Sequence, residues 1–280
     1  MSVSPRPTRP GHVSPINLPR PRGDLSVERS GAVVTLTLNR PDSRNAIRLG
    51  MYEELPRLIA QIGADSAIKV LVVRGAGRQA FGSGADISEF QEVRGDADSA
   101  RSYNEHVAAA EDALSGLRKP TIAMIHGYCI GGGCGLALAC DLRFADERAR
   151  LAITAAKLGL VYGFESTKRL VDLVGPARAK WILMSGKHID AETALRVGLI
   201  DEIIPADDLE RHTYEFAELL TTRAQYSVRA AKVIVERIAA GQAEDDDVIT
   251  DLRNSSFDTD DYAEGVRAFL DKRPPVFTWS

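Results

Sequence analysis

The chain has 280 residues, of which 44% are hydrophobic and 26% are charged, as in one fairly large globular domain or a domain with a small appendage. A net charge of −4 gives no basic footprint for nucleic acid, and no window approaches the ~18 uncharged apolar residues of a membrane span. The cysteines, Cys129, Cys134 and Cys140, lack metal-ligand spacing with histidines, which predicts buried free thiols in a reducing cytosol.

The first 23 residues contain six prolines, four arginines and no acidic residue. Arginine without acids could indicate an organelle transit peptide, which must form an amphipathic helix. Prolines every few residues prevent that helix. A disordered tail over residues 1–23 is the prediction.

The next segments alternate between strand and helix patterns. VVTLTL at 33–38 predicts a strand, and Asn39-Arg40-Pro41 ends it. An amphipathic helix is predicted over 48–62, with a kink or break at Pro56, and a buried strand over 69–74. After the loop AFGSGADISEF at 80–90, a helix is predicted over 99–117, with alanines and Leu114 on one face.

The most informative stretch is KPTIAMIHGYCIGGGCGLALACDL at 119–142. A β-rich run, three glycines (Gly131 to Gly133) and an apolar run predict a strand, a glycine turn and a buried helix. The first amides of a helix lack intrahelical partners and suit an anionic oxygen. The glycines match neither the Walker nor the dinucleotide pattern. They could also serve only to let the helix pack tightly on a sheet.

The remaining chain is predicted to be two short strands, at 141–145 and 151–153, followed by helices. Helices are expected at 166–174, ending at Gly175-Pro176, then at 177–184, 190–197, 207–225 and 227–240. Another begins after the acidic run 244–247, and the last covers part of 261–277. Strands alternating with helices favour an α/β core.

Two of these segments resemble the signatures of the enoyl-CoA hydratase/isomerase (crotonase) superfamily. They are the GADI loop after Phe81, and GYCIGGGCGLALACD at 127–141. The resemblance extends from about Leu25 to Phe277 and includes the "NRPxxxNA" pattern ending at Asn45-Ala46. It implies repeated ββα units as a core over 24–205, and a helical region over 206–280 for oligomerisation and for enclosing CoA.

The resemblance also implies a site. Backbone N–H groups of Ala85 and Gly132 would form an oxyanion hole for an acyl-CoA thioester. Residues expected to contact the substrate or its CoA are Ala46, Gly84, Ala85, Asp86, Ile87, Ser88, Gly131, Gly132, Phe269 and Lys272. The last two would act from a helix that crosses to a neighbouring subunit; a plain amphipathic helix would explain their spacing equally well. Asp86 is also expected to organise its own loop by hydrogen bonding.

The sequence departs from the hydratases of the superfamily at both catalytic glutamates. The corresponding positions are Gly135, two residues after the third glycine, and Ala155 in TAAKLG. Neither side chain transfers protons, so hydration with those bases is not expected. Tyr162 and Glu165 border the acyl group by motif position and are the predicted replacements; packing and helix capping are their structural alternatives.

The sequence therefore predicts a cytoplasmic acyl-CoA enzyme, a homotrimer or dimer of trimers, that makes a thioester enolate. A lyase reaction, by decarboxylation or C–C cleavage, is favoured. The alternative is an enoyl-CoA hydratase or isomerase that uses Glu165. A non-catalytic acyl-CoA-binding or RNA-binding relative is a third possibility, although the acidic balance opposes RNA. No metal and no cofactor apart from the substrate's CoA are expected, and no nucleic acid or membrane partner.

Overall fold

The computed structural model describes residues 23–278, so the predicted disordered tail lies outside the described residues except for Gly23. Its larger sheet has six strands in the order β1-β2-β3-β5-β7-β10. The pair β1–β2 is antiparallel, and the other neighbours are parallel. These strands are β1 (Leu25–Ser30), β2 (Val33–Leu38), β3 (Val70–Gly75), β5 (Thr121–Ile125), β7 (Leu142–Asp146) and β10 (Glu202–Ile204).

A second sheet has four short strands in the order β4-β6-β8-β9. They are β4 (Ala80–Gly82), β6 (Tyr128–Ile130), β8 (Arg150–Ala152) and β9 (Ile189–Asp190). The strand pairs β3-β4, β5-β6 and β7-β8 each place their first strand in the large sheet and their second in the small one, and helices follow each pair. This arrangement confirms the α/β fold class with repeated ββα units.

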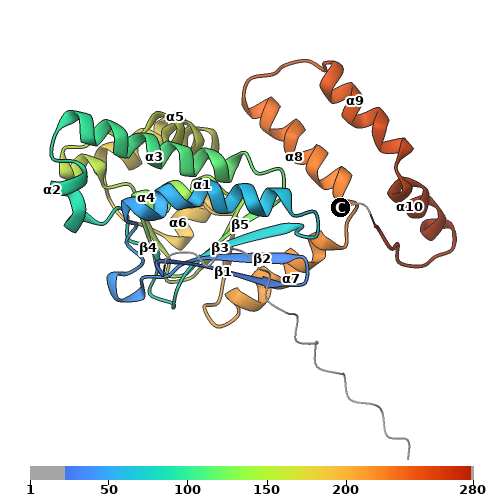
Figure 1. Cartoon of the computed structure of the whole chain (residues 1–280), viewed down its shortest axis with the longest axis horizontal. Coiled ribbons are helices and arrows are strands. Elements are labelled where there is room, and N and C mark those ends of the chain that lie inside the picture. The colour runs from blue at the N-terminus through green and yellow to red at the C-terminus, as the bar shows by residue number, and fades with distance from the viewer. Residues whose placement is uncertain (1–22, 279–280) are drawn as a thin grey trace, which may run out of the picture.

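Helices cover both faces of the large sheet (Figure 1). Because side chains alternate along a strand, Val70 and Val72 face one side and Leu71 and Val73 the other. The first side packs on α7 (Leu209–Thr221), and the second faces the main core under α1, α3 and α4. These three helices are α1 (Leu49–Ala64), α3 (Ala97–Ser115) and α4 (Gly132–Leu138).

Two predictions about helix breaks had opposite outcomes. The possible break at Pro56 was wrong, because α1 continues through it. Six buried side chains, spread over both halves of α1, hold the helix on the core: Met51, Tyr52, Leu55, Leu58, Ile59 and Ile62. The predicted stop at Gly175-Pro176 is confirmed. Gly175 has φ +72° and ψ 164° and interrupts α5 (Phe164–Ser185).

The predicted buried free thiols are confirmed, since all three cysteines are free and buried. Burial raises the pKa of Cys140 to about 12, so this thiol is not ionised at neutral pH. Within residues 23–278 no helix is both long and apolar enough to cross a membrane.

The last helices lie to one side of the body (Figure 1). They are α8 (Gln225–Ala239), α9 (Asp247–Ser255) and α10 (Asp260–Leu270), while α2 (Phe90–Val93) and α6 (Ala191–Arg196) belong to the body. Several large apolar side chains on and after α8 are exposed, among them Val235, Ile238, Phe269, Leu270 and Val276. A surface of this kind suits the predicted oligomerisation role of 206–280, which stays a prediction.

Candidate active site

A short backbone pairing positions the GADI loop. The N–H of Ile47 donates to the carbonyl of Gly84 at 2.8 Å, and the N–H of Asp86 donates to the carbonyl of Ile47 at 2.9 Å. Successive peptide groups of an extended segment point to opposite sides. The N–H of Ala85 therefore points away from Ile47.

The start of α4 lies on that other side. Gly132 is the first residue of the helix, after Gly131 at φ +52°, so its N–H has no carbonyl one turn earlier to bond. A Cβ placed on Gly132 would be 3.6 Å from the nitrogen of Ala85, and one placed on Gly84 would be 3.8 Å from the nitrogen of Gly132. The two amides predicted from the motifs are therefore neighbours, in a geometry that could hold one oxyanion.

The glycines at this helix also allow close packing. A Cβ on Gly132 would lie 2.2 Å from the hydroxyl oxygen of Tyr52, and a Cβ on Gly133 would lie 2.6 Å from the carbonyl oxygen of Gly82. Neither distance is compatible with a side chain. The close packing of the glycines does not exclude a role for the Gly132 amide, which has no intrahelical partner.

Arg40 and Asp86 connect the loops around the site. The guanidinium of Arg40 donates to the carbonyl of Ala46 and to the carboxylate of Asp86, both at 2.7 Å. Asp86 also accepts from the N–H and hydroxyl of Ser88, at 3.1 and 2.7 Å. The Ser88 and Arg40 hydrogen bonds lower the pKa of Asp86. The carboxylate does organise its loop, as expected, while contact of Ala46, Asp86, Ile87 and Ser88 with CoA stays a prediction.

A carboxylate lies beside Gly135, and it comes from a different helix. Glu111 of α3 is only 2% exposed, and a Cβ on Gly135 would be 2.1 Å from its Oε1. Burial raises the pKa of Glu111 to about 7, although a hydrogen bond from Ser166 and the charge of Arg169 lower it. Such a group is close to half ionised at neutral pH, the condition that suits a general acid/base.

The two predicted replacements are placed differently. Tyr162 reaches the site: its hydroxyl donates to the carbonyl of Gly131 at 3.1 Å and lies 3.1 Å from where a Cβ of Gly135 would be. Burial raises the pKa of Tyr162, so its hydroxyl is neutral. Glu165 is exposed in the first turn of α5, where a carboxylate favours the helix dipole. Ala155 begins a short 3₁₀ turn and is half-buried.

Sequence reasoning missed Glu111 and Tyr52. The signal for Glu111 was present, because it lies three residues before Leu114 and shares the buried face of that helix. An acid on an apolar helix face, with no basic residue three or four positions away, is unusual enough to single out. Tyr52 had no such signal, since a tyrosine on the apolar face of α1 looks like ordinary core.

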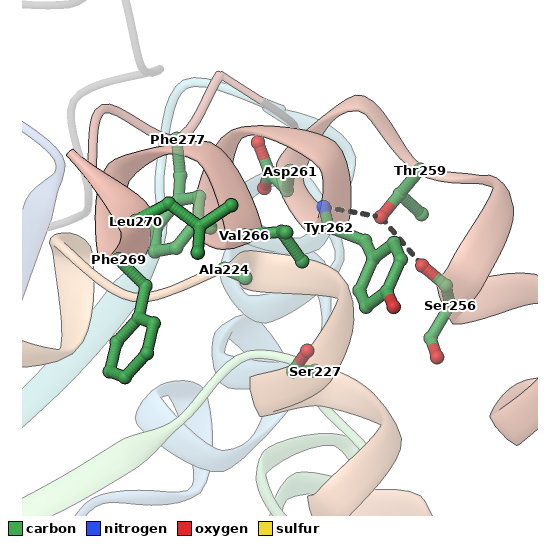
Figure 2. Close-up of a pocket in the computed structure, with 11 residues that line it drawn as sticks. Ala224, Ser227, Ser256, Thr259, Asp261, Tyr262, Val266, Phe269, Leu270 and Phe277 are labelled. Carbon is green, nitrogen blue, oxygen red and sulfur yellow. Dashed lines mark hydrogen bonds between the residues drawn. The ribbon is translucent and has the colours of Figure 1, made fainter.

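Phe269 and Lys272 are not brought to these amides within one chain. α10 lies on the other side of the molecule from α4 (Figure 1). Phe269 is 82% exposed beside a groove of about 420 Å³, which also involves Val266, Leu270 and Phe277 (Figure 2). Lys272 follows the helix with φ +53°. Their expected action on a neighbouring subunit stays a prediction.

Known proteins are similar to this chain over most of its length. The family model described as enoyl-CoA hydratase/isomerase matches residues 28–279. A short-chain-enoyl-CoA hydratase of Clostridium acetobutylicum is 32% identical over 89% of this chain and 95% of its own. A 2,3-dehydroadipyl-CoA hydratase of Escherichia coli is 33% identical over 91% of this chain and 98% of its own.

Solved structures are similar over the same length. An enoyl-CoA hydratase from Bacillus anthracis has a TM-score of 0.82 and 32% identity, covering 91% of this chain and 98% of its own. An enoyl-CoA hydratase/carnithine racemase from Magnetospirillum magneticum has a TM-score of 0.87 and 34% identity, covering 91% and 95%. The predicted crotonase-like fold is therefore confirmed, and the chain belongs to the enoyl-CoA hydratase/isomerase family.

Proposed function

We propose that the protein catalyses proton transfer next to the carbonyl of an acyl-CoA thioester, as a hydratase or isomerase. The thioester oxygen would accept from the N–H groups of Ala85 and Gly132. As a proton leaves the carbon beside the carbonyl, or water adds one carbon further, negative charge moves onto this oxygen. Amides that are already oriented stabilise that charge without reorganising.

The observation that carries this proposal is the buried carboxylate of Glu111 beside Gly135. In the hydratase pattern a glutamate would stand at position 135, on α4; here the carboxylate reaches the same place from α3. Its pKa, raised to about 7 by burial, allows it to accept and return a proton near neutral pH. Relatives named as hydratases are consistent with such chemistry.

The presence of Glu111 favours hydration or isomerisation over the predicted lyase reaction. The lyase prediction depended on the absence of a proton-transfer group at Gly135 and Ala155, and Glu111 can supply one. Near the GADI loop, hydrogen bonds from Ser88 and Arg40 lower the pKa of Asp86, and Glu89 is partly exposed beside Arg48, whereas Glu111 is buried and its pKa is raised. Glu111 is the better candidate than either of them, and than the exposed Glu165.

A lyase remains a second candidate because of Tyr162. Its buried hydroxyl is as close to position 135 as the carboxyl carbon of Glu111, both at 3.1 Å from a Cβ built there. A neutral hydroxyl could orient a carboxylate about to leave as CO₂, provided that Glu111 is protonated. This reaction would need Tyr162 more than Glu111.

A substrate panel separates the candidates. Purified protein is incubated with α,β-enoyl-, β,γ-enoyl- and malonyl-type CoA esters, and products are identified by mass spectrometry. We expect hydration or double-bond migration, reduced roughly 10²- to 10⁴-fold by Glu111→Gln, the usual contribution of a proton-transfer group. Loss of CO₂ that survives Glu111→Gln but not Tyr162→Phe would establish the lyase. Tight CoA binding without any turnover would indicate a non-catalytic binder.

A further inference from the structure

The two oxygens of the Glu111 carboxylate have different surroundings. Oε2 accepts a short hydrogen bond from the hydroxyl of Ser166 and lies 3.3 Å from Nη1 of Arg169. Oε1 is the oxygen nearest to Gly135, and no hydrogen bond to it occurs within the described part of the chain. One oxygen is held and the other faces position 135.

Arg169 is itself fixed. Its Nη2 donates to Oδ1 of Asp112 at 2.7 Å and to the hydroxyl of Ser115 at 3.0 Å. The guanidinium therefore bridges α5 to three residues of α3, and its side chain is only 18% exposed. Because both terminal nitrogens of the guanidinium have partners, Arg169 can hold Oε2 in one place with little further loss of side-chain entropy.

We propose that Ser166 and Arg169 are positioning residues that hold Oε2 of Glu111, so that Oε1 is the atom that exchanges the proton. The inference rests on the proposed function and specifies how its acid/base works. In the forward step, Oε1 takes the proton from carbon or water, and the electron pair released moves into the enolate or the new C–O bond. Oε1 then returns the proton, which restores the carboxylate without any other reactant.

The same contacts set the charge of Glu111. Burial favours the neutral acid, whereas the Ser166 hydrogen bond and the Arg169 cation favour the carboxylate. Asp112 opposes them slightly by its own negative charge, and Tyr52 and Tyr162, which also face Glu111, are held neutral by burial. Loss of Ser166 or Arg169 should therefore leave a carboxyl that is harder to ionise.

The test uses Ser166→Ala and Arg169→Gln, with Lys168→Gln as the control. Lys168 is the neighbour of Arg169 on α5, and it pairs with Asp172 instead of Glu111. In the wild type, kcat/KM should fall as pH decreases through about 7, because the base becomes protonated. In each test variant, this acid-side fall in kcat/KM (the acid limb) should occur about one pH unit higher. One unit is the low end of the pKa shift that a neighbouring opposite charge produces. The control should not move the acid limb.

A second readout does not need turnover. Infrared difference spectra between wild type and Glu111→Gln follow the carboxyl band of Glu111 with pH, and its midpoint should rise in both variants. Arg169→Lys keeps the cation, so its midpoint should lie between those of the wild type and Arg169→Gln. This comparison holds even if Ser166→Ala folds poorly. If Glu111→Gln abolishes activity while neither the limb nor the band moves, the positioning role is wrong and the proposed function stands. If Glu111→Gln is fully active, the proposed base itself is wrong.

Discussion

The substitution Gly135→Ala should inactivate the enzyme without destabilising it. The added Cβ would lie 2.1 Å from Oε1 of Glu111, whereas ordinary contacts begin near 3.4 Å, so this oxygen must move by roughly 1.3 Å. A displacement of about 1 Å in a catalytic group can cost on the order of 10²-fold in rate, which is the loss in kcat we expect.

Stability should change in the opposite direction. The atoms that must give way are side-chain atoms and not backbone, namely Oε1, with Cδ of Glu111 and the Tyr162 hydroxyl at 3.1 Å, and alanine is favoured over glycine in a helix by about 1 kcal/mol. The Tm measured by circular dichroism should therefore stay the same or rise. Gly50→Ala is the matched control, because Gly50 is also helical and a Cβ there meets nothing within 4 Å.

Hydration is measured as the loss of absorbance of the conjugated thioester. Full activity of Gly135→Ala would refute the placement of Glu111 as the base. The double variant Glu111→Ala/Gly135→Glu moves the carboxylate to α4, as in the hydratase pattern. It should be more active than Glu111→Ala alone if a carboxylate at this point is what the reaction requires.

Three further predictions concern the amide, the buried acid and the tail. Gly132→Pro removes an oxyanion donor and should lower turnover roughly 10²- to 10³-fold. Because a side chain at 132 would meet the Tyr52 hydroxyl, the rates are compared in a Tyr52→Phe background. Unchanged turnover would mean that Gly132 does not face the thioester. Native Glu111 keeps its proton between its ordinary pKa of 4.5 and about 7, while the unfolded chain loses it, so the free energy of unfolding should fall by about 3 kcal/mol as pH rises through that window. Urea unfolding at several pH values checks this: Glu111→Gln should lack that fall, and an identical pH dependence would contradict the raised pKa. A truncation that begins at Asp24 should keep wild-type stability and turnover, because the proline-rich composition of 1–23 cannot contribute to a core; failure to fold would show that the segment matters.

Local patterns were sufficient where a segment's own residues decide its structure. Strand β2 has the predicted limits, since a run of buried residues rich in valine and threonine, bounded by turn residues, strongly favours a strand. The glycine turn before α4 and the interruption at Gly175 follow likewise from backbone freedom that glycine alone provides. The two amides predicted to hold an oxyanion could be named because two motifs carry them, and the structure places these amides close together.

Tertiary structure decided what depends on segments meeting. A kink or a break was predicted at Pro56, but α1 continues through it because burial of the helix on both sides outweighs one lost hydrogen bond. The short strands β4 and β6 were not predicted from the sequence; β4 pairs with β6, and β6 also pairs with β8. Figure 1 shows α3 lying alongside α1, and α3 also contacts α4.

The acid beside the candidate active site is the clearest such case. Glu111 and Gly135 are separated by a helix end, two strands and a glycine turn, and neither residue alone predicts chemistry. Their meeting requires that α3 and α4 pack so closely that only a glycine leaves room for the carboxylate. The sequence by itself singled out the two amides that prove to be neighbours. The acid next to it, and the charge of that acid, depend on burial between helices, which only the folded chain creates.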